Sequence, residues 1–378
     1  MAKTAWTWPW DEFRWLATGF FLIFVFFLST QSHRVLKLLQ LLYKQPKSSS
    51  SWVKVGSVSK LYMYPIKSCG AMEMGSVKML RSGMATLNGV FRDRHFMFVD
   101  ATDGNKFVIG KVSPIVVKNK VRVGYGKPAL STIQPTLHSN GDILTLSAPN
   151  MTDIDVDLRL VMTSDQKLFA SMWSLQMQTE GIDCGDEVSA WIGQFLGVPE
   201  GQIRLITFQP ESCHNSREIN KMNSAFSAQG NGQENEKVQL AFNDKAPYMV
   251  LSEASLEDLN SRVEKKVDIR NFRPNIVVKG TKAFDENKWT ATKIGSSTEL
   301  TSMMPCGRCS HVTVDPCTGT PDKHGEPLTT LKRYRSPTPK DVELFGSGPH
   351  FGIYMLLSSE GTIHLGDPVY AKFNARSL

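Results

Sequence analysis

The chain has 378 residues, of which 41% are hydrophobic and 21% are charged, a composition that excludes an intrinsically disordered protein. This length allows one large domain or two ordinary ones, each able to bury a core. The net charge of +7 suits an anionic ligand, a negatively charged partner or a membrane surface, and it does not choose among them. The six cysteines are mostly far apart, which argues against a disulfide framework and for a reducing compartment.

An apolar segment lies near the start of the chain. Residues 15–28 carry no charge, which is shorter than the span of about 17–25 residues usual for a membrane helix. A cleaved secretory signal, with an apolar core of about 7–15 residues, is the alternative. The basic residues from Arg34 to Lys60, with no acid before Glu73, favour a retained anchor whose following domain faces the cytosol. We predict a membrane-anchor helix and basic linker over 1–51, in the outer mitochondrial membrane or, alternatively, the endoplasmic reticulum or peroxisomal membrane.

Short strand patterns dominate the rest of the chain. Period-two alternation, clearest from Asp153 to Leu160, indicates half-buried strands. A helix is expected after Glu187, and Ser252 is expected to cap another. Strands outnumber helices and most are not linked by helices, so we predict a β-rich α+β protein. Strands are expected at 53–64, 92–99, 153–160, 203–208, 276–278, 311–314, 354–357 and 362–373, helices at 188–196, 253–263 and 328–335, and a long surface loop at 211–237.

Two cysteines three positions apart, Cys306 and Cys309, allow three interpretations. A structural zinc site needs four ligands, and His311 and His324 lack the spacing to complete one. A redox disulfide needs a helix that starts at the first cysteine, whereas Ser310–Pro316 predicts a strand and a turn. The third interpretation is one thiolate that binds a metal held by an organic, phosphate-bearing cofactor.

Basic side chains that could bind such a phosphate occur in four separate segments. Each of them alone is more often a solvated surface charge, and together they only suggest an anion site. They are Lys67 beside Ser68, Arg92 with Arg94, Arg273 near Asn275, and Arg308 beside Cys309.

Seven short motifs, taken together and in order, resemble the MOSC family, and within it the mitochondrial amidoxime-reducing components. The resemblance runs from about Lys60 to the carboxyl end. It implies a MOSC β-barrel domain over 181–378, preceded over 52–180 by a β-rich MOSC-associated domain. The motifs are Tyr64–Cys69, Arg92–Arg94, Leu251–Leu256, Asn271–Ile276, Cys306–Cys309, Val314–Pro316 and Gly366–Tyr370.

The resemblance also implies a cofactor, the molybdenum cofactor, whose pterin-dithiolene carries a terminal phosphate. The metal would take the thiolate of Cys309, leaving Cys306 in a structural role. One departure is Lys245-Ala246, where relatives usually have a small hydroxyl residue before the following proline. The implied cofactor contacts are Lys67, Ser68, Arg92, Arg273, Asn275, Gly307, Arg308 and Tyr354.

The activity implied by the resemblance is the reduction of N-hydroxylated compounds such as amidoximes and hydroxylamines. The resemblance implies electrons from NADH through cytochrome b5 reductase and cytochrome b5. The sequence has no nucleotide-binding glycine-rich turn or haem-ligation motif of its own, so separate electron donors are needed in any case. No nucleic acid partner is expected. Two other functions stay open: a molybdenum cofactor carrier or sulfur-transfer module, and a membrane-tethered thiol oxidoreductase that uses Cys306 and Cys309.

Overall fold

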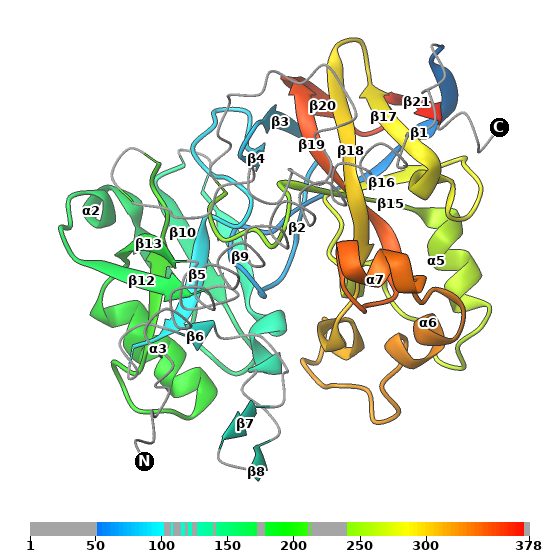
Figure 1. Ribbon diagram of the computed structural model, residues 1–378. Coiled ribbons are helices and arrows are strands. Elements are labelled where there is room, and N and C mark those ends of the chain that lie inside the picture. The colour runs from blue at the N-terminus through cyan, green and yellow to red at the C-terminus, as the bar shows by residue number, and fades with distance from the viewer. Residues whose placement is uncertain are drawn as a thin grey trace, which may run out of the picture. The chain divides into compact units, whose positions relative to one another are not determined.

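The structure of the protein is a computed structural model (Figure 1), in which the described residues are 51–101, 107–108, 115–117, 120–122, 127–138, 141–171, 178–210, 213 and 240–373. The predicted anchor at 15–28 lies outside the described residues, as does the 211–237 loop apart from Cys213. Within the described ranges, no helix combines the length and apolarity needed to cross a bilayer.

Seven strands form a closed barrel. Their order is β16, β15, β19, β18, β17, β21 and β1, and a further pairing of β1 with β16 closes the ring. All neighbours are antiparallel except β15 and β16. The barrel strands are β1 (Val53–Met63), β15 (Tyr248–Ser252), β16 (Ile276–Lys279), β17 (Trp289–Ile294), β18 (Thr298–Gly307), β19 (His350–Ser359) and β21 (Pro368–Phe373). The first strand of the described chain therefore completes a barrel built otherwise from the last 130 or so residues.

A five-stranded sheet in the order β12, β13, β14, β5 and β6 forms the other main layer. Its pairing of β14 with β5 joins residues on both sides of the predicted limit at 180–181, and that limit stays a prediction. The strands of this sheet are β5 (Phe96–Asp100), β6 (Phe107–Val108), β12 (Lys167–Ser171), β13 (Gln178–Asp183) and β14 (Ile203–Thr207). The smaller strands are β2 (Met72–Glu73), β3 (Ser76–Leu80), β4 (Gly83–Ala85), β7 (Ile115–Val117), β8 (Lys120–Arg122), β9 (Gln134–Leu137), β10 (Ile143–Ser147), β11 (Ile154–Asp157) and β20 (Gly361–His364).

The described helices are short, and those predicted from local signals are present. Ser252 caps α5 by accepting a hydrogen bond from the Ser255 amide, because a hydroxyl at this position satisfies an amide that the helix leaves unpaired. The α-helices are α2 (Leu158–Met162), α3 (Asp186–Leu196), α5 (Glu253–Asn260), α6 (Leu328–Tyr334) and α7 (Pro339–Phe345), and the 3-10 helices are η1 (Pro128–Thr132), η3 (Ile269–Phe272), η4 (Asp285–Lys288) and η5 (Ser310–Thr313). The prediction of a β-rich fold is confirmed.

Three strand predictions were wrong in part. The strand expected at 153–160 ends at Asp157, whose carboxylate accepts the Arg159 amide and starts α2. The segment 311–314 lies in and just after η5 instead of a strand. The strand expected from residue 92 begins only at Phe96, because Arg94 has a φ of 56° and extended backbone requires a negative φ.

Candidate functional site

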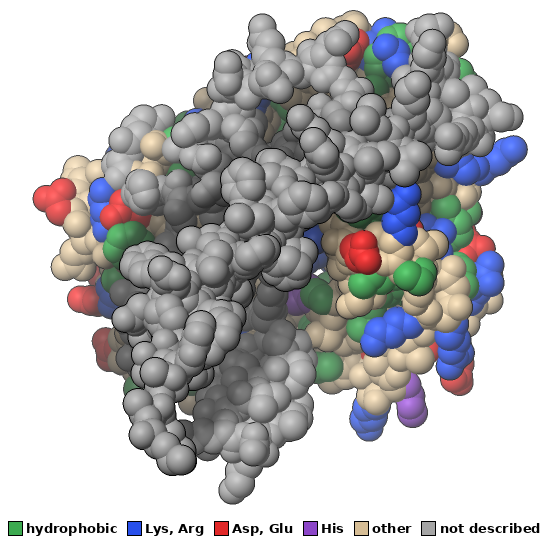
Figure 2. Space-filling model, viewed as in Figure 1, with side chains coloured by type: hydrophobic (Ala, Val, Ile, Leu, Met, Phe, Trp, Pro, Cys, Tyr) green, Lys and Arg blue, Asp and Glu red, His purple; other side chains and the backbone are tan. Residues whose placement is uncertain are grey.

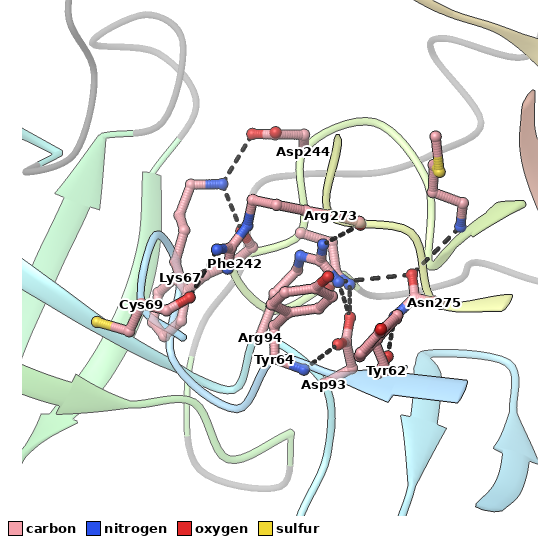
Figure 3. Close-up of polar contacts among 12 residues, drawn as sticks. Tyr62, Tyr64, Lys67, Cys69, Asp93, Arg94, Phe242, Asp244, Arg273 and Asn275 are labelled. Atoms are coloured by element: carbon pink, nitrogen blue, oxygen red, sulfur yellow. Dashed lines mark hydrogen bonds and ion pairs between the residues drawn. The ribbon is translucent and has the colours of Figure 1, made fainter. Parts of the chain in front are cut away.

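Two arginines lie against one buried tyrosine just after β1 (Figure 3). The guanidinium carbons of Arg94 and Arg273 lie 4.7 and 4.2 Å from the centroid of the Tyr64 ring. Such cation–π contacts are worth about 0.5–2 kcal/mol each, depending on how far the charge is desolvated. We call Tyr64, Arg94 and Arg273 the arginine–tyrosine cluster. It joins three distant segments, because Arg94 follows Tyr64 by 30 residues and Arg273 follows Arg94 by about 180.

The backbone at this place is held in an uncommon conformation. Ser68, Arg94 and Arg273 have φ values of 70°, 56° and 53°, in the left-handed region that side chains with a Cβ rarely adopt. They are three of the five non-glycine residues with positive φ in the described part of the chain. Local strain of this kind persists where the surrounding structure fixes it, and it concentrates at functional sites.

Two of the cations near the cluster have carboxylate partners. Arg94 forms an ion pair with Asp93, whose buried carboxylate also accepts the Tyr64 amide at 2.8 Å. The Nζ of Lys67 lies 2.7 Å from the Asp244 carboxylate and 2.8 Å from the Phe242 carbonyl. The positions of both side chains are therefore set by opposite charge as well as by hydrogen bonds.

Arg273 differs from these two cations. Its Nη1 donates to the Cys69 carbonyl at 2.6 Å, but its buried Nη2 has no hydrogen-bond partner. No carboxylate in the described ranges lies within ion-pair distance of it. Burial and the nearby charge of Arg94 lower the pKa of Arg273 to about 10. Because a buried charge without a counter-ion is costly, this position suits an anionic ligand.

Asn275 and Arg92, both predicted cofactor contacts, occupy different environments. The buried amide of Asn275 accepts from the Met249 amide at 3.2 Å and donates to the Tyr62 carbonyl at 3.3 Å, so it fastens β15 to the end of β1. It also accepts Nη1 of Arg94 at 3.5 Å. The Nε of Arg92 donates to the carbonyl of Gly89 at 3.4 Å, and the structure does not bring its side chain into hydrogen-bond contact with the cluster.

The two thiols of the Cys306–Cys309 segment lie in different environments. Cys306 is buried in β18, and burial raises its pKa. It contacts Tyr354 on the neighbouring β19, whose pKa is also raised by burial. Cys309 is exposed and, like Cys306, forms no disulfide. It occupies the N-cap position of the short η5, but its side chain makes no capping hydrogen bond. The structure therefore offers one accessible thiol and one inaccessible thiol.

The side chain between them, Arg308, is bound to the backbone. Its Nε donates to the Phe351 carbonyl and its Nη1 to the Phe272 carbonyl, both at 2.8 Å, and Nη2 also donates to Phe351. Since Phe272 precedes Arg273, the cysteine segment and the arginine–tyrosine cluster are directly connected. Gly352 has a φ of +79°, and a Cβ there would lie 2.8 Å from the backbone oxygen of Val250, so only glycine fits beside this guanidinium.

The structure links Arg308 to the residue before Arg273, and it links Arg273 and Asn275 through Arg94. Cys309 and Lys67 adjoin this arrangement along the chain, as the residue after Arg308 and the residue two before Cys69. Gly307 ends β18 opposite His350, next to this connection. Four neighbouring residues with evident roles were not predicted: Tyr64, Asp93, Asp244 and Gly352. Tyr64 belongs to a motif noted in the sequence, whereas nothing in the sequence around Gly352 indicates its close packing.

Comparisons with known proteins assign the chain to a family. The MOSC N-terminal beta barrel domain matches residues 55–199, and the MOSC domain matches residues 237–370. Mitochondrial amidoxime-reducing component 1 of Mus musculus is 36% identical over 326 residues, covering 86% of this chain and 85% of that protein. Component 2 of Bos taurus is 37% identical and component 1 of Homo sapiens 36% identical, each over 317 residues that cover 84% of this chain and 83% of the relative. The resemblance inferred from the sequence motifs is confirmed: this chain belongs to the family of the mitochondrial amidoxime-reducing components and contains a MOSC N-terminal domain followed by a MOSC domain.

Proposed function

We propose that the protein is a molybdenum-cofactor-dependent reductase of N-hydroxylated compounds such as amidoximes and hydroxylamines. The observation that carries the proposal is the connection of an exposed thiol, Cys309, to a buried guanidinium without a counter-ion, Arg273. The relatives named as amidoxime-reducing components support the same activity. The reduction breaks the N–O bond, consumes electrons and protons, and releases water.

The residues present fit the cofactor. Cys309 would offer a soft thiolate ligand to molybdenum, and the guanidinium of Arg273 would donate to the phosphate, which is the anion its unpartnered Nη2 lacks. When bound, the cofactor would supply the redox chemistry for oxygen removal. Lys67, fixed by Asp244 and the Phe242 carbonyl, would add a second positive charge. The predicted contacts of Ser68, Arg92, Asn275, Gly307, Arg308 and Tyr354 stay proposals.

Electron supply and location belong to the same proposal. NADH would provide the electrons through cytochrome b5 reductase and cytochrome b5, and the catalytic domain would face the cytosol from the outer mitochondrial membrane. The relatives are named as mitochondrial, and the basic residues after the apolar segment 15–28 are the support for the orientation.

Substitution of the exposed thiol tests the function. The full-length wild-type protein should contain molybdenum and pterin, and it should reduce benzamidoxime when cytochrome b5, its reductase and NADH are supplied. Cys309→Ala should remove a metal ligand. Its metal content and its rate should therefore fall by more than the roughly 10–100-fold that is usual when residues supporting a metal ligand are changed. Metal and pterin content and the rate of NADH oxidation are the measurements.

Two other cysteines provide controls. Cys317 is also exposed and forms no disulfide, so Cys317→Ala should keep both the cofactor and the rate. Unchanged activity of Cys309→Ala would contradict the ligand assignment. An equal loss in Cys306→Ala would favour a thiol–disulfide reaction, and a cofactor-loaded protein without reductase activity would favour a carrier.

A further inference from the structure

Two buried hydrogen-bond donors of the arginine–tyrosine cluster lack acceptors. The hydroxyl of Tyr64 and Nη2 of Arg273 are both buried, and neither has a hydrogen-bond partner among the described residues. The Tyr64 ring is the surface against which the Arg273 guanidinium lies, with 4.2 Å between the guanidinium carbon and the ring centroid. A buried polar group without a partner costs about 1–3 kcal/mol, so two of them at one place indicate a missing acceptor.

Charge indicates what kind of acceptor is missing. Burial raises the pKa of Tyr64, so its phenol keeps its proton at neutral pH and can donate it in a hydrogen bond. Arg94 is paired with Asp93, whereas Arg273 has no carboxylate partner within the described ranges. Among the nearby charges, that of Arg273 acts most strongly on the Tyr64 phenol. A neutral acceptor would complete the hydrogen bonds but leave the positive charge uncompensated.

We propose that Tyr64 is a further residue of the anion-binding site, whose hydroxyl donates to the same oxyanion group as Nη2 of Arg273 and whose ring holds that guanidinium in place. The ligand class is a phosphate-type oxyanion. This inference rests on the proposed function only for the identity of that group as the cofactor phosphate; the site itself follows from the two donors and the unpaired charge.

The cluster also limits how the anion is held. Arg94 cannot replace Arg273, because Arg94 is bound to Asp93 and donates to the Arg273 carbonyl at 3.2 Å. Arg94 instead supports the backbone at Arg273, whose φ of 53° directs the following chain toward Asn275. Tyr64 therefore contributes a hydroxyl donor beside the N–H groups that Arg273 keeps after Nη1 donates to the Cys69 carbonyl.

The test uses the full-length protein without cofactor, with inorganic phosphate as the probe. Tyr64→Phe keeps the ring and removes only the hydroxyl. The matched control is Tyr62→Phe, two residues earlier in the same segment, with a ring 6.4 Å from that of Tyr64 and a hydroxyl that already has Lys60 as a hydrogen-bond partner. The readouts are the rise in melting temperature with increasing phosphate, compared with chloride at equal ionic strength, and the molybdenum and pterin content after loading.

We expect Tyr64→Phe to lose most of the phosphate-dependent stabilisation and to retain several-fold less cofactor, while Tyr62→Phe behaves as the wild type. An unchanged phosphate response in Tyr64→Phe would overturn the inference and indicate a shared buried water. Failure of the proposed function looks different. A wild type that responds to phosphate through Tyr64 but never contains molybdenum contradicts that function and leaves the anion site standing.

Discussion

Arg308 and Arg273 are two largely buried arginines, and Arg308 donates to the carbonyl of Phe272, the residue before Arg273. They differ in how many of their nitrogens have hydrogen-bond partners. Every nitrogen of the Arg308 guanidinium donates to a backbone carbonyl. Arg273 uses Nη1 on the Cys69 carbonyl and leaves Nη2 without a partner. Among the described residues, no carboxylate lies within ion-pair distance of either guanidinium. The charge of Arg308, however, is surrounded by backbone carbonyl dipoles.

The difference separates an arginine whose three nitrogens all donate to the backbone from one that has a buried nitrogen left for a ligand. Carbonyl dipoles replace the water that Arg308 gave up, so its burial is compensated inside the fold. The buried charge of Arg273 is compensated only in part. Burial, together with the nearby charge of Arg94, also lowers its pKa to about 10. On the face seen in Figure 2, Lys and Arg side chains are spread over α5, α6 and α7 with Asp and Glu among them.

The strongest test of this comparison removes Arg308. Arg308→Met should leave the carbonyls of Phe272 and Phe351 without donors and lower the free energy of unfolding by about 3 kcal/mol or more, given about 1.5–3 kcal/mol for each hydrogen bond to a charged group. Urea denaturation of the cofactor-free protein measures it.

Arg308→Lys is the companion variant. Lysine keeps the charge but cannot place donors on both carbonyls in a fixed plane, so its loss should be intermediate. If Arg308→Met unfolds at the same urea concentration as the wild type, the structural role of Arg308 is wrong.

His95 sharpens the comparison because its Nε2 is another buried atom without a partner, in a ring that is neutral. Burial, and secondarily the charge of Arg92, lower the pKa of His95 to about 3 from its ordinary 6.5. As the pH falls below about 6.5 the unfolded chain binds this proton and the folded chain does not. Stability should therefore decline by up to about 1.4 kcal/mol per pH unit from this group until the pH approaches 3.

His95→Asn should flatten that decline, because its amide can still donate to the Phe208 carbonyl that the ring contacts at 3.1 Å but does not titrate. Urea denaturation at a series of pH values between 7 and 4 provides the slope. His138→Asn, at an exposed position, should keep the wild-type slope. A slope unchanged in His95→Asn would mean that other groups cause the acid sensitivity.

The smallest effect on stability is expected at Arg273. Arg273→Met loses one hydrogen bond and one ring contact, but it also removes an uncompensated buried charge, and such replacements are often neutral. We expect the free energy of unfolding of the cofactor-free protein to change by no more than about 1 kcal/mol, while the stabilisation by phosphate disappears. If Arg273→Met lowers the free energy of unfolding as much as Arg308→Met does, the two arginines have the same structural role and the distinction drawn here is wrong.

Local signals predicted part of this arrangement. The cap at Ser252 and the helix that follows depend on neighbours three or four residues away, so the sequence pattern was sufficient for α5. The start of β5 was not predictable in this way, because the left-handed backbone of Arg94 is held by contacts with Tyr64, 30 residues earlier. Long-range contacts also decide whether an arginine meets carbonyls or an anion, and for Arg308 the pattern of charges alone could not distinguish these outcomes.

The closure of the barrel by β1 has a consequence for how the chain folds. Ser57 pairs with Lys279, and Val53 pairs with Ala371, so one strand must find two partners that are synthesised more than 200 residues later. Contacts between positions this far apart are slow to form. During synthesis only the end of β1, at Tyr62 and Met63, has an early partner, β2. The rest of β1 is unpaired until β16 and β21 exist, and an unpaired edge can pair with the wrong strand. We therefore expect the insertion of β1 between β16 and β21 to be the last step of barrel formation. A fragment that lacks residues 53–63 would leave the barrel open between these two strands.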